Sequence, residues 1–301
     1  MSMLKSVTQG RLSLPELIIL YGPDGVGKST FGASAPKPIF IGAEKGTANL
    51  NTSRFSNIST FADVQKGIAE LTNDVHDFQS LVIDSLDWLE PLLHAKICEQ
   101  WKVESIERVD GGYGKGYVVA NKEWLAFTKT LSDLRERRKM NIILLAHSMV
   151  KTFQDPTQNA AYDRYQLKLN DKASALFREF VDSVFFANYE VYTKKDQDSK
   201  KSLAFGEGKR VMYTERRPAY DAKSRYSLPS QMALSWDDYI IAKTTGSPNK
   251  PEELLKNISE LLAQVPDAAV KTAIEAAVKR DQNDSGKLQV TLNRLRTMLG
   301  Q

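Results

Sequence analysis

Cysteine is almost missing from this chain, which has a single one, Cys98, among its 301 residues. A lone cysteine forms neither an intramolecular disulfide nor a cysteine zinc cluster, and the histidines lack metal-ligand spacing. Long apolar runs are missing too, since none approaches the roughly 20 residues of a membrane span. Residues 1–11 hold no signal-peptide core. We therefore expect a protein of a reducing cytoplasm without a membrane partner.

The chain also lacks a large excess of charge of either sign. It has 41 Lys and Arg against 37 Asp and Glu, a formal net charge of +4. This mildly basic balance permits nucleic-acid binding without requiring it. Hydrophobic residues make up 42% and charged residues 26% of the chain. These fractions are typical of a soluble globular protein, and the length allows one large core plus an appendage.

One octapeptide, GPDGVGKS at residues 22–29, fits G-x-x-x-x-G-K-[ST], the phosphate-binding P-loop. The apolar run 17–21 enters it and residues 29–33 leave it as a helix start, so strand, glycine loop and helix follow in the required order. A glycine-rich turn that matches by chance is the alternative. We predict nucleotide binding by Gly22, Pro23, Asp24, Gly25, Val26, Gly27, Lys28, Ser29 and Thr30.

The residue types of this loop suit ATP and Mg²⁺. Glycines let the backbone turn tightly and present N–H groups to phosphate oxygens, next to the positive end of the following helix. Lys28 is a point charge for the β- and γ-phosphates, and two unit charges about 4 Å apart interact by roughly 4 kcal/mol near a protein surface. Ser29 offers a hydroxyl to Mg²⁺, which needs few protein ligands.

Short apolar runs alternate with helical patterns over residues 17–245. The runs cover residues 17–21, 39–43, 81–84, 141–147 and 181–191, and the helical patterns cover residues 62–71, 88–101 and 121–139. Continuous apolar runs are typical of strands buried on both faces of a parallel sheet. We predict an α/β fold with a mainly parallel central sheet and antiparallel edge strands. These include a hairpin of residues 202–205 with 209–214 around residues 206–208.

A turn-rich segment, residues 244–251, separates this part from a helical tail. The tail has helical patterns at residues 251–265, 267–279 and 285–299. We predict an ATPase core over residues 1–245 and a small helical appendage over residues 246–301.

Three predicted strands end in a polar side chain. Asp84 follows one and can hold Mg²⁺ together with Ser29, although an ordinary helix N-cap is the alternative. Glu44 follows another and can orient and deprotonate the attacking water, the alternative being a solvated residue. His147 ends the third and can sense the γ-phosphate, whereas most lone histidines are structural.

The order of these residues resembles that of the RecA-like P-loop ATPases. The P-loop, Glu44, Asp84 and His147 succeed one another as the P-loop, catalytic glutamate, Walker B aspartate and sensor do there, with histidine in place of the family's usual glutamine. The resemblance covers about residues 10–240. It points to the phage-encoded RecA-like single-strand annealing and recombination ATPases, short core-only relatives of RecA and RadA, and implies a RecA-like core.

A basic segment strengthens the resemblance. Lys223 and Arg225, within residues 222–229, resemble the Lys-Asn-Arg-Phe-Gly motif of RadA-type proteins, with Ser224 for Asn and Ser227 for Gly. In that family the two basic residues act across a subunit interface or on DNA. A basic pair that reaches a neighbour's γ-phosphate would stabilise transition-state charge. This implies a homo-oligomeric ring or filament, and a solvated basic turn is the alternative.

Two segments suit single-stranded DNA, because rings interleaved with basic residues stack bases at about 1–3 kcal/mol each. Residues 108–117 hold four glycines, and residues 149–172 are predicted as a long polar loop. A nucleotide lid or a protein-binding loop is the alternative for both. The expected DNA contacts are Arg108, Tyr113, Lys115, Tyr117, Lys151, Phe153, Arg164, Tyr165 and Lys168.

Together these features predict a DNA-stimulated ATPase that binds single-stranded DNA, acts in recombination or annealing, and hydrolyses MgATP between subunits. A single-strand DNA-binding protein is a further expected partner, and the location is the host cytoplasm if a phage encodes the chain. The alternative is a nucleotide-switched adaptor P-loop protein, or a helicase loader, whose loops and tail bind protein.

Overall fold

The computed structural model describes residue 7 and residues 14–42, 49–190, 192–195, 202–205, 208–245, 251–282 and 285–298. Glu44, the predicted turn residues 206–207 and the linker residues 246–250 lie outside this part. The chain divides into two compact units, each described by itself below. The first is Met1–Leu20, Ala35–His147 and Leu167–Asp182, and the second is Tyr21–Ser34, Ser148–Gln166 and Ser183–Gln301.

The strands follow the order β12-β10-β7-β1-β5-β4-β2-β3, with β11 beside β7 and β6 beside β5. Strands β2, β3, β4 and β5 pair in parallel, whereas β7, β10, β11 and β12 pair antiparallel. The predicted α/β fold with a mainly parallel central sheet and antiparallel edge strands is confirmed. The strand bounds are β1 Leu17–Gly22, β2 Pro38–Ile41, β3 Ser53–Arg54, β4 Ser80–Ile83, β5 Asn141–Phe153, β6 Tyr162–Leu167, β7 Ser183–Tyr189, β10 Arg210–Tyr213, β11 Lys223–Ser224 and β12 Gln231–Ala233.

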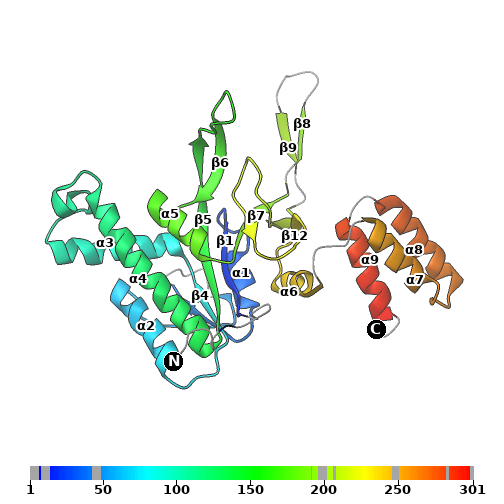
Figure 1. Cartoon of the computed structure of the whole chain (residues 1–301), viewed down its shortest axis with the longest axis horizontal. Coiled ribbons are helices and arrows are strands. Elements are labelled where there is room, and N and C mark those ends of the chain that lie inside the picture. The colour runs from blue at the N-terminus through cyan, green and yellow to red at the C-terminus, as the bar shows by residue number, and fades with distance from the viewer. Residues whose placement is uncertain are drawn as a thin grey trace. The chain divides into compact units, whose positions relative to one another are not determined.

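Helices α2 to α5 belong to the first unit, where α4 lies along α2, α3 and α5 (Figure 1, cyan to green). Thr60 and Asp63 form a capping box that starts α2, because each side chain accepts a backbone N–H of the other residue. The bounds are α2 Phe61–Asn73, α3 Leu86–Trp101, α4 Lys115–Arg138 and α5 Asp171–Phe180, with a 3₁₀ helix at Ile106–Gly111.

An aromatic cluster joins α2, α4 and α5. The rings of Phe61, Trp124, Phe127 and Phe177 lie with centroids 5.0 to 5.8 Å apart, mostly edge to face. Such pairs add about 0.5–1.5 kcal/mol each beyond the burial of their area. These contacts hold α2, α4 and α5 together within the first unit.

The second unit carries helices α1, Lys28–Ala33, and α6, Trp236–Thr245. Phe31 of α1 packs edge to face on Trp236, with centroids 5.6 Å apart, and Tyr239 packs on Phe185 of β7 at 5.3 Å. Since α1 begins at Lys28, within the predicted P-loop, this packing fixes the helix that ends the loop.

The predicted hairpin of residues 202–205 with 209–214 is wrong. Strand β9, Ser202–Phe205, pairs antiparallel with β8, Tyr192–Lys195, whereas β10 pairs with β7 and β12. The reason is burial, because Val211 and Met212 of β10 are 1% and 0% exposed in the larger sheet. Strands β9 and β10 therefore belong to different pairings.

The predicted long polar loop over residues 149–172 is also wrong in part. Strand β5 continues to Phe153, β6 returns from Tyr162 to Leu167, and α5 begins at Asp171. Val150, Thr152 and Phe153 of β5 and the two tyrosines of β6 are residue types that fit a pleated surface. Only residues 154–161 between them lack strand or helix.

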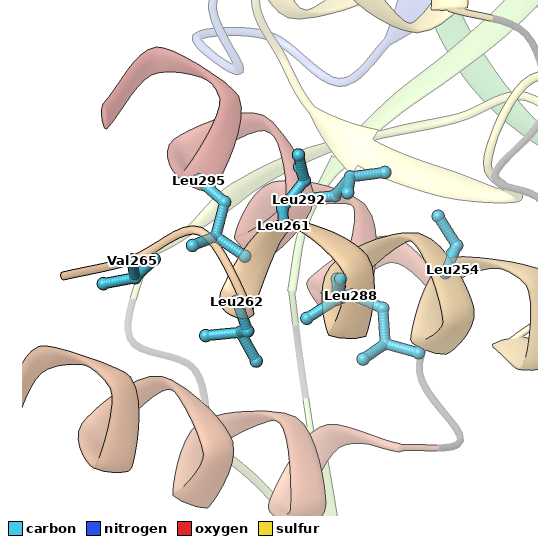
Figure 2. Packing of buried hydrophobic residues seen from close by; sticks show 8 residues of the cluster. Leu254, Leu261, Leu262, Val265, Leu288, Leu292 and Leu295 are labelled. Carbon is cyan, nitrogen blue, oxygen red and sulfur yellow. The ribbon is translucent and has the colours of Figure 1, made fainter. Parts of the chain in front are cut away.

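The tail contains the three predicted helices, as α7 Pro251–Leu262, α8 Ala268–Asp281 and α9 Ser285–Met298. Helices α7 and α9 share a core of leucines (Figure 2), with Leu254 and Leu288 fully buried. Helix α8 packs through Val270, Ile274 and Val278, which are only partly buried. The predicted domain boundary at residues 245 and 246 stays a prediction.

Candidate nucleotide-binding site

Strand β1 delivers the chain into the glycine loop in a fixed position, because all of Leu17–Gly22 is buried. Gly25 and Gly27 then adopt φ values of 71° and 107°, in the left-handed region where a side chain is strained. Val26 between them is fully buried and anchors the tip of the loop. Helix α1 begins at Lys28, with Gly27 as its N-cap. The predicted strand, loop and helix are therefore present.

Strand β7 backs the loop at close range. A β-carbon placed on Gly22 would lie 2.2 Å from the carbonyl oxygen of Ala187, so only glycine fits there. The hydroxyl of Tyr189 donates a hydrogen bond of 2.9 Å to the carbonyl oxygen of Gly25. Strand β7 therefore helps to fix the conformation of the loop, together with the glycines of the loop itself.

Lys28 folds back over the loop. Its Nζ donates to the carbonyl oxygens of Gly22 at 3.1 Å and Pro23 at 2.9 Å, and the residue is 6% exposed. A buried ammonium group over a turn of left-handed glycines is a cradle for an anion. Ser29 is partly buried, while Asp24 and Thr30 are exposed. The residues present fit the phosphates of a nucleotide.

In the first unit, Asp84 follows β4 and is 2% exposed. Its N–H donates to the carbonyl oxygen of Ile41, and a β-carbon on Gly42 would lie 2.1 Å from the Asp84 carbonyl oxygen. The ends of β2 and β4 are therefore locked together. Glu44, which follows β2, lies outside the described residues, and its role stays a prediction.

Asp87, which the sequence reasoning missed, holds His147. Its two carboxylate oxygens contact the His147 backbone N–H at 2.9 Å and ring Nδ1 at 2.8 Å. Burial raises the pKa of the Asp87 carboxyl group, but the hydrogen bonds from His147 outweigh it and lower that pKa to about 2. The ionised carboxylate favours a proton on Nδ1, which fixes the tautomer and orientation of the ring.

The remaining predicted ATPase residues lie in the second unit. Lys223 is half-buried in β11, which pairs with β7 through Lys223 and Ser224. Arg225 follows it and is exposed. The segment that resembles the RadA-type motif thus contains a short strand, and the action of Lys223 and Arg225 on a neighbouring subunit stays a prediction.

The glycine segment at residues 108–117 is part helix. Helix α4 begins at Lys115, six residues before the predicted helix, so Lys115 and Tyr117 lie in its first turn. The prediction began the helix too late because it treated the glycines as a loop. Gly116 instead packs on the 3₁₀ helix so closely that an added β-carbon would lie 1.9 Å from the Ile106 carbonyl oxygen. Tyr113 is fully exposed.

The charged residues of this segment have local partners. Arg108 pairs with Glu104 at 2.8 Å and Lys115 pairs with Asp110 at 3.7 Å, and both basic side chains are more than half exposed. The Tyr117 hydroxyl donates to the Glu107 carboxylate at 2.8 Å, which raises the pKa of Tyr117. A backbone hydrogen bond and then this hydroxyl lower the pKa of Glu107. Exposed ion pairs of this kind are weak and exchange readily for other anions.

Strands β5 and β6 hold most of the second set of predicted DNA contacts. Arg164 is 4% exposed and pairs with Asp221 at 3.0 Å, with its guanidinium 5.2 Å from the Phe153 ring. The Tyr165 ring packs on Phe186 with centroids 5.0 Å apart. Of this set, Lys151 and Phe153 are partly exposed and Lys168, in the first unit, is exposed.

Two further properties concern metal ions and membranes. Across the described ranges, no three His, Cys, Asp or Glu side chains cluster as metal ligands. Ser29 and Asp84 stay the predicted residues for Mg²⁺. None of the described helices is both long enough and apolar enough to span a bilayer.

The strand, loop and buried lysine define a P-loop nucleotide-binding protein of α/β fold. A model of the AAA domain family matches residues 15–226, well over half of the chain, and the chain belongs to this family. The prediction of a P-loop protein of AAA type is therefore confirmed, and nucleotide binding accompanies membership of this family.

Two individual proteins are similar to parts of the chain. One is the SPbeta prophage-derived uncharacterized protein YorG of Bacillus subtilis (strain 168), 24% identical over 137 residues, which are 44% of this chain and 41% of that protein. The aligned stretch thus spans about two fifths of that relative. The other is a crystal structure of the RadB recombinase, 16% identical with a TM-score of 0.38, covering 68% of this chain and 84% of that one.

Proposed function

We propose that this chain is an ATPase that binds single-stranded DNA and acts in DNA recombination or annealing. The observation that carries the ATPase part is the glycine loop, with Lys28 buried over left-handed Gly25 and Gly27. The order of Lys28, Glu44, Asp84 and His147, which resembles the RecA-like ATPases, supports the recombination part. The likeness of one stretch to a prophage-derived protein supports a phage setting in a host cytoplasm.

The proposed reaction is hydrolysis of ATP to ADP and phosphate. Loop N–H groups and Lys28 bind the phosphates, and Glu44 orients and deprotonates the attacking water. Ser29 and Asp84 would hold Mg²⁺, which neutralises phosphate charge when bound. His147 responds to the γ-phosphate, and Asp87 keeps its ring in place.

We place Lys223 and Arg225 at the nucleotide of a neighbouring copy. Their positive charges would stabilise the negative charge that develops on the transferred phosphoryl group. Hydrolysis would then require an oligomer, a ring or a filament. The accompanying expectation is a specific activity that rises with protein concentration.

The proposed partner is single-stranded DNA, with Tyr113 as the main stacking residue. Its ring is fully exposed between glycines, and Arg108 and Lys115 lie on the same segment. A ring that no other group covers can stack on a base, and nearby cations neutralise phosphates. The further predicted contacts are Lys151, Phe153, Arg164, Tyr165 and Lys168, and the Arg164 guanidinium lies 5.2 Å from the Phe153 ring.

The test is ATP hydrolysis with and without single-stranded DNA, for the native chain and Lys28→Ala. We expect DNA to stimulate the native chain and the variant to be inactive under both conditions. Activity that is indifferent to DNA and to protein concentration would contradict the recombination part. Full activity of Lys28→Ala would contradict the ATPase part.

The second candidate is a nucleotide-switched adaptor, and the tail favours it. Helices α7 and α9 bury their own set of leucines (Figure 2), and α8 is only partly buried against them. A helical element with its own core can bind a protein partner. Salt dependence separates the two candidates, because a DNA-binding protein loses affinity steeply as salt rises, whereas an adaptor binds DNA weakly at any salt.

A further inference from the structure

Arg210 stands on β10 in register with the strand that supports the P-loop. It lies opposite Tyr189 of β7, and the Tyr189 hydroxyl donates to the Gly25 carbonyl oxygen. The sequence shows Arg210 only as one of several basic residues after residue 208, a pattern typical of a solvated face. The antiparallel pairing of β10 with β7 brings it to the loop.

The side chain of Arg210 lies against the last glycine of the loop. A β-carbon placed on Gly27 would be 3.2 Å from Nη1 and 3.7 Å from Cδ of Arg210, and 3.5 Å from Cδ2 of Leu234. Gly27 directly precedes Lys28. The guanidinium group is therefore beside the part of the loop whose backbone is expected to face the phosphates.

The charge of Arg210 is not neutralised locally. Arg210 is exposed, and no described residue forms an ion pair or a hydrogen bond with its guanidinium. The residue that follows its cross-strand neighbour Tyr189 is acidic. That acid, Glu190, is engaged by Lys209 at 3.3 Å and by Gln231 at 3.1 Å. An arginine held against a phosphate-binding loop with its donors available is arranged for an anion.

We infer that Arg210 binds phosphate oxygens of the nucleotide that the loop of its own chain holds. The inference rests on the proposed ATP binding. Lys28 already donates to two loop carbonyls, whereas the planar fork of Arg210 can donate two parallel hydrogen bonds to one phosphate. Arg210 thus contributes to affinity within one subunit, in contrast to Lys223 and Arg225, which are proposed to act on a neighbour.

The experiment compares Arg210→Ala and Arg210→Lys with the native chain by calorimetric titration with ATP, ADP and adenosine. Lys209→Ala is the matched control, because it removes the same charge from the adjacent residue, whose partner is Glu190. We expect Arg210→Ala to weaken ATP and ADP binding by roughly tenfold to 100-fold, the range for a lost charge-assisted hydrogen bond. Arg210→Lys should recover part of the loss, and Lys209→Ala and adenosine binding should be unchanged.

Three results would overturn the inference. Unchanged affinity of Arg210→Ala for ATP and ADP would remove Arg210 from the site. An equal loss for adenosine would show a contact with the base in place of the phosphates, and an equal loss in Lys209→Ala would show a general charge effect. If the native chain binds neither ATP nor ADP, the proposed function itself fails. This outcome differs from a failure of the inference alone, because then the native chain and all variants show no binding of either nucleotide.

Discussion

Two glycine-rich segments of this chain use the same residue in opposite ways. In the P-loop, Gly25 and Gly27 turn through left-handed backbone next to the side chains of Tyr189, Arg210 and Leu234. In the segment at residues 108–117, Gly111 and Gly114 are left-handed too, but nothing approaches within 4 Å of their β-carbon positions. The P-loop is packed, whereas the second segment is open at Gly111 and Gly114 and packs on the 3₁₀ helix only through Gly112 and Gly116.

The difference shows what each segment can bind. A packed loop presents fixed backbone groups and one buried ammonium, which suits a small anion whose shape is constant. An open segment that displays a fully exposed ring suits a long flexible partner, since bases differ in shape but all stack. Glycine content alone does not distinguish the two segments, whereas their surroundings do.

The largest expected effect is on the packed side. Lys28→Ala should lower ATP hydrolysis by roughly 100-fold or more, because it removes a fixed cation from the developing phosphate charge. Steady-state phosphate release measures this, with the exposed Lys37→Ala as control. A loss of less than fivefold in Lys28→Ala would show that the loop is not the catalytic site.

Alanine substitutions at one glycine of each segment compare the two segments by their effect on the free energy of unfolding. Gly22→Ala should lower the free energy of unfolding by about 3 kcal/mol, near the upper end for overpacking, because its β-carbon would overlap the Ala187 carbonyl oxygen. Gly114→Ala should cost about 1 kcal/mol, from left-handed backbone strain alone. Urea denaturation of the two variants checks the ranking, and equal losses would contradict it.

The partly buried Asp87–His147 pair should give a pH-dependent contribution to stability. The folded-state pKa of Asp87 is lowered to about 2, below its unfolded value, so the contribution is present above about pH 4 and is lost as the pH falls towards 2. We expect the free energy of unfolding of the native chain to be about 2 kcal/mol higher than that of Asp87→Asn at pH 7. The difference should be smaller at pH 3.

Denaturation at several pH values measures this difference. Glu70→Gln is a suitable control, since Glu70 is exposed and only 3.9 Å from Lys66 in a weak helix pair. A difference between native chain and Asp87→Asn that stays constant from pH 7 to pH 3 would contradict the role of the ionised Asp87 carboxylate.

The smallest expected effect is on the open side. Tyr113→Ala should weaken single-stranded DNA binding by about 1 kcal/mol, the low end for one stacked base, and leave the free energy of unfolding unchanged. Fluorescence anisotropy with a labelled oligonucleotide measures the affinity. Tyr113→Phe, which keeps the ring, should bind as the native chain does, and equal losses in both variants would argue against stacking.

Local sequence signals predicted the P-loop and most strands, because each depends on neighbouring residues. The glycines that need left-handed backbone, the apolar runs of β1 and β4 and the three tail helices are all local patterns. The failures depend on distant partners. Asp87 and His147 are 60 residues apart, and β10 pairs with β7 because of burial that no window around residue 210 reveals.

The sequence also did not predict the contact of Arg210 with Gly27, because these residues are distant in the chain. Likewise, the extension of β5 and β6 into residues predicted as loop follows from pairing between the two strands. Sequence patterns identify which residues can perform the chemistry, whereas the pairing of strands decides which of them meet.

We propose that this chain binds both ATP and single-stranded DNA and that each ligand strengthens the binding of the other. The most direct measurement is the affinity for single-stranded DNA with and without ATP, for the native chain and Lys28→Ala. We predict that ATP tightens DNA binding by the native chain, because a ligand that stimulates use of ATP is coupled to the ATP site and binding couplings are reciprocal. ATP should have no effect on DNA binding by Lys28→Ala, because this variant is expected not to bind the phosphates. DNA affinity of the native chain that is the same with and without ATP would contradict the claim.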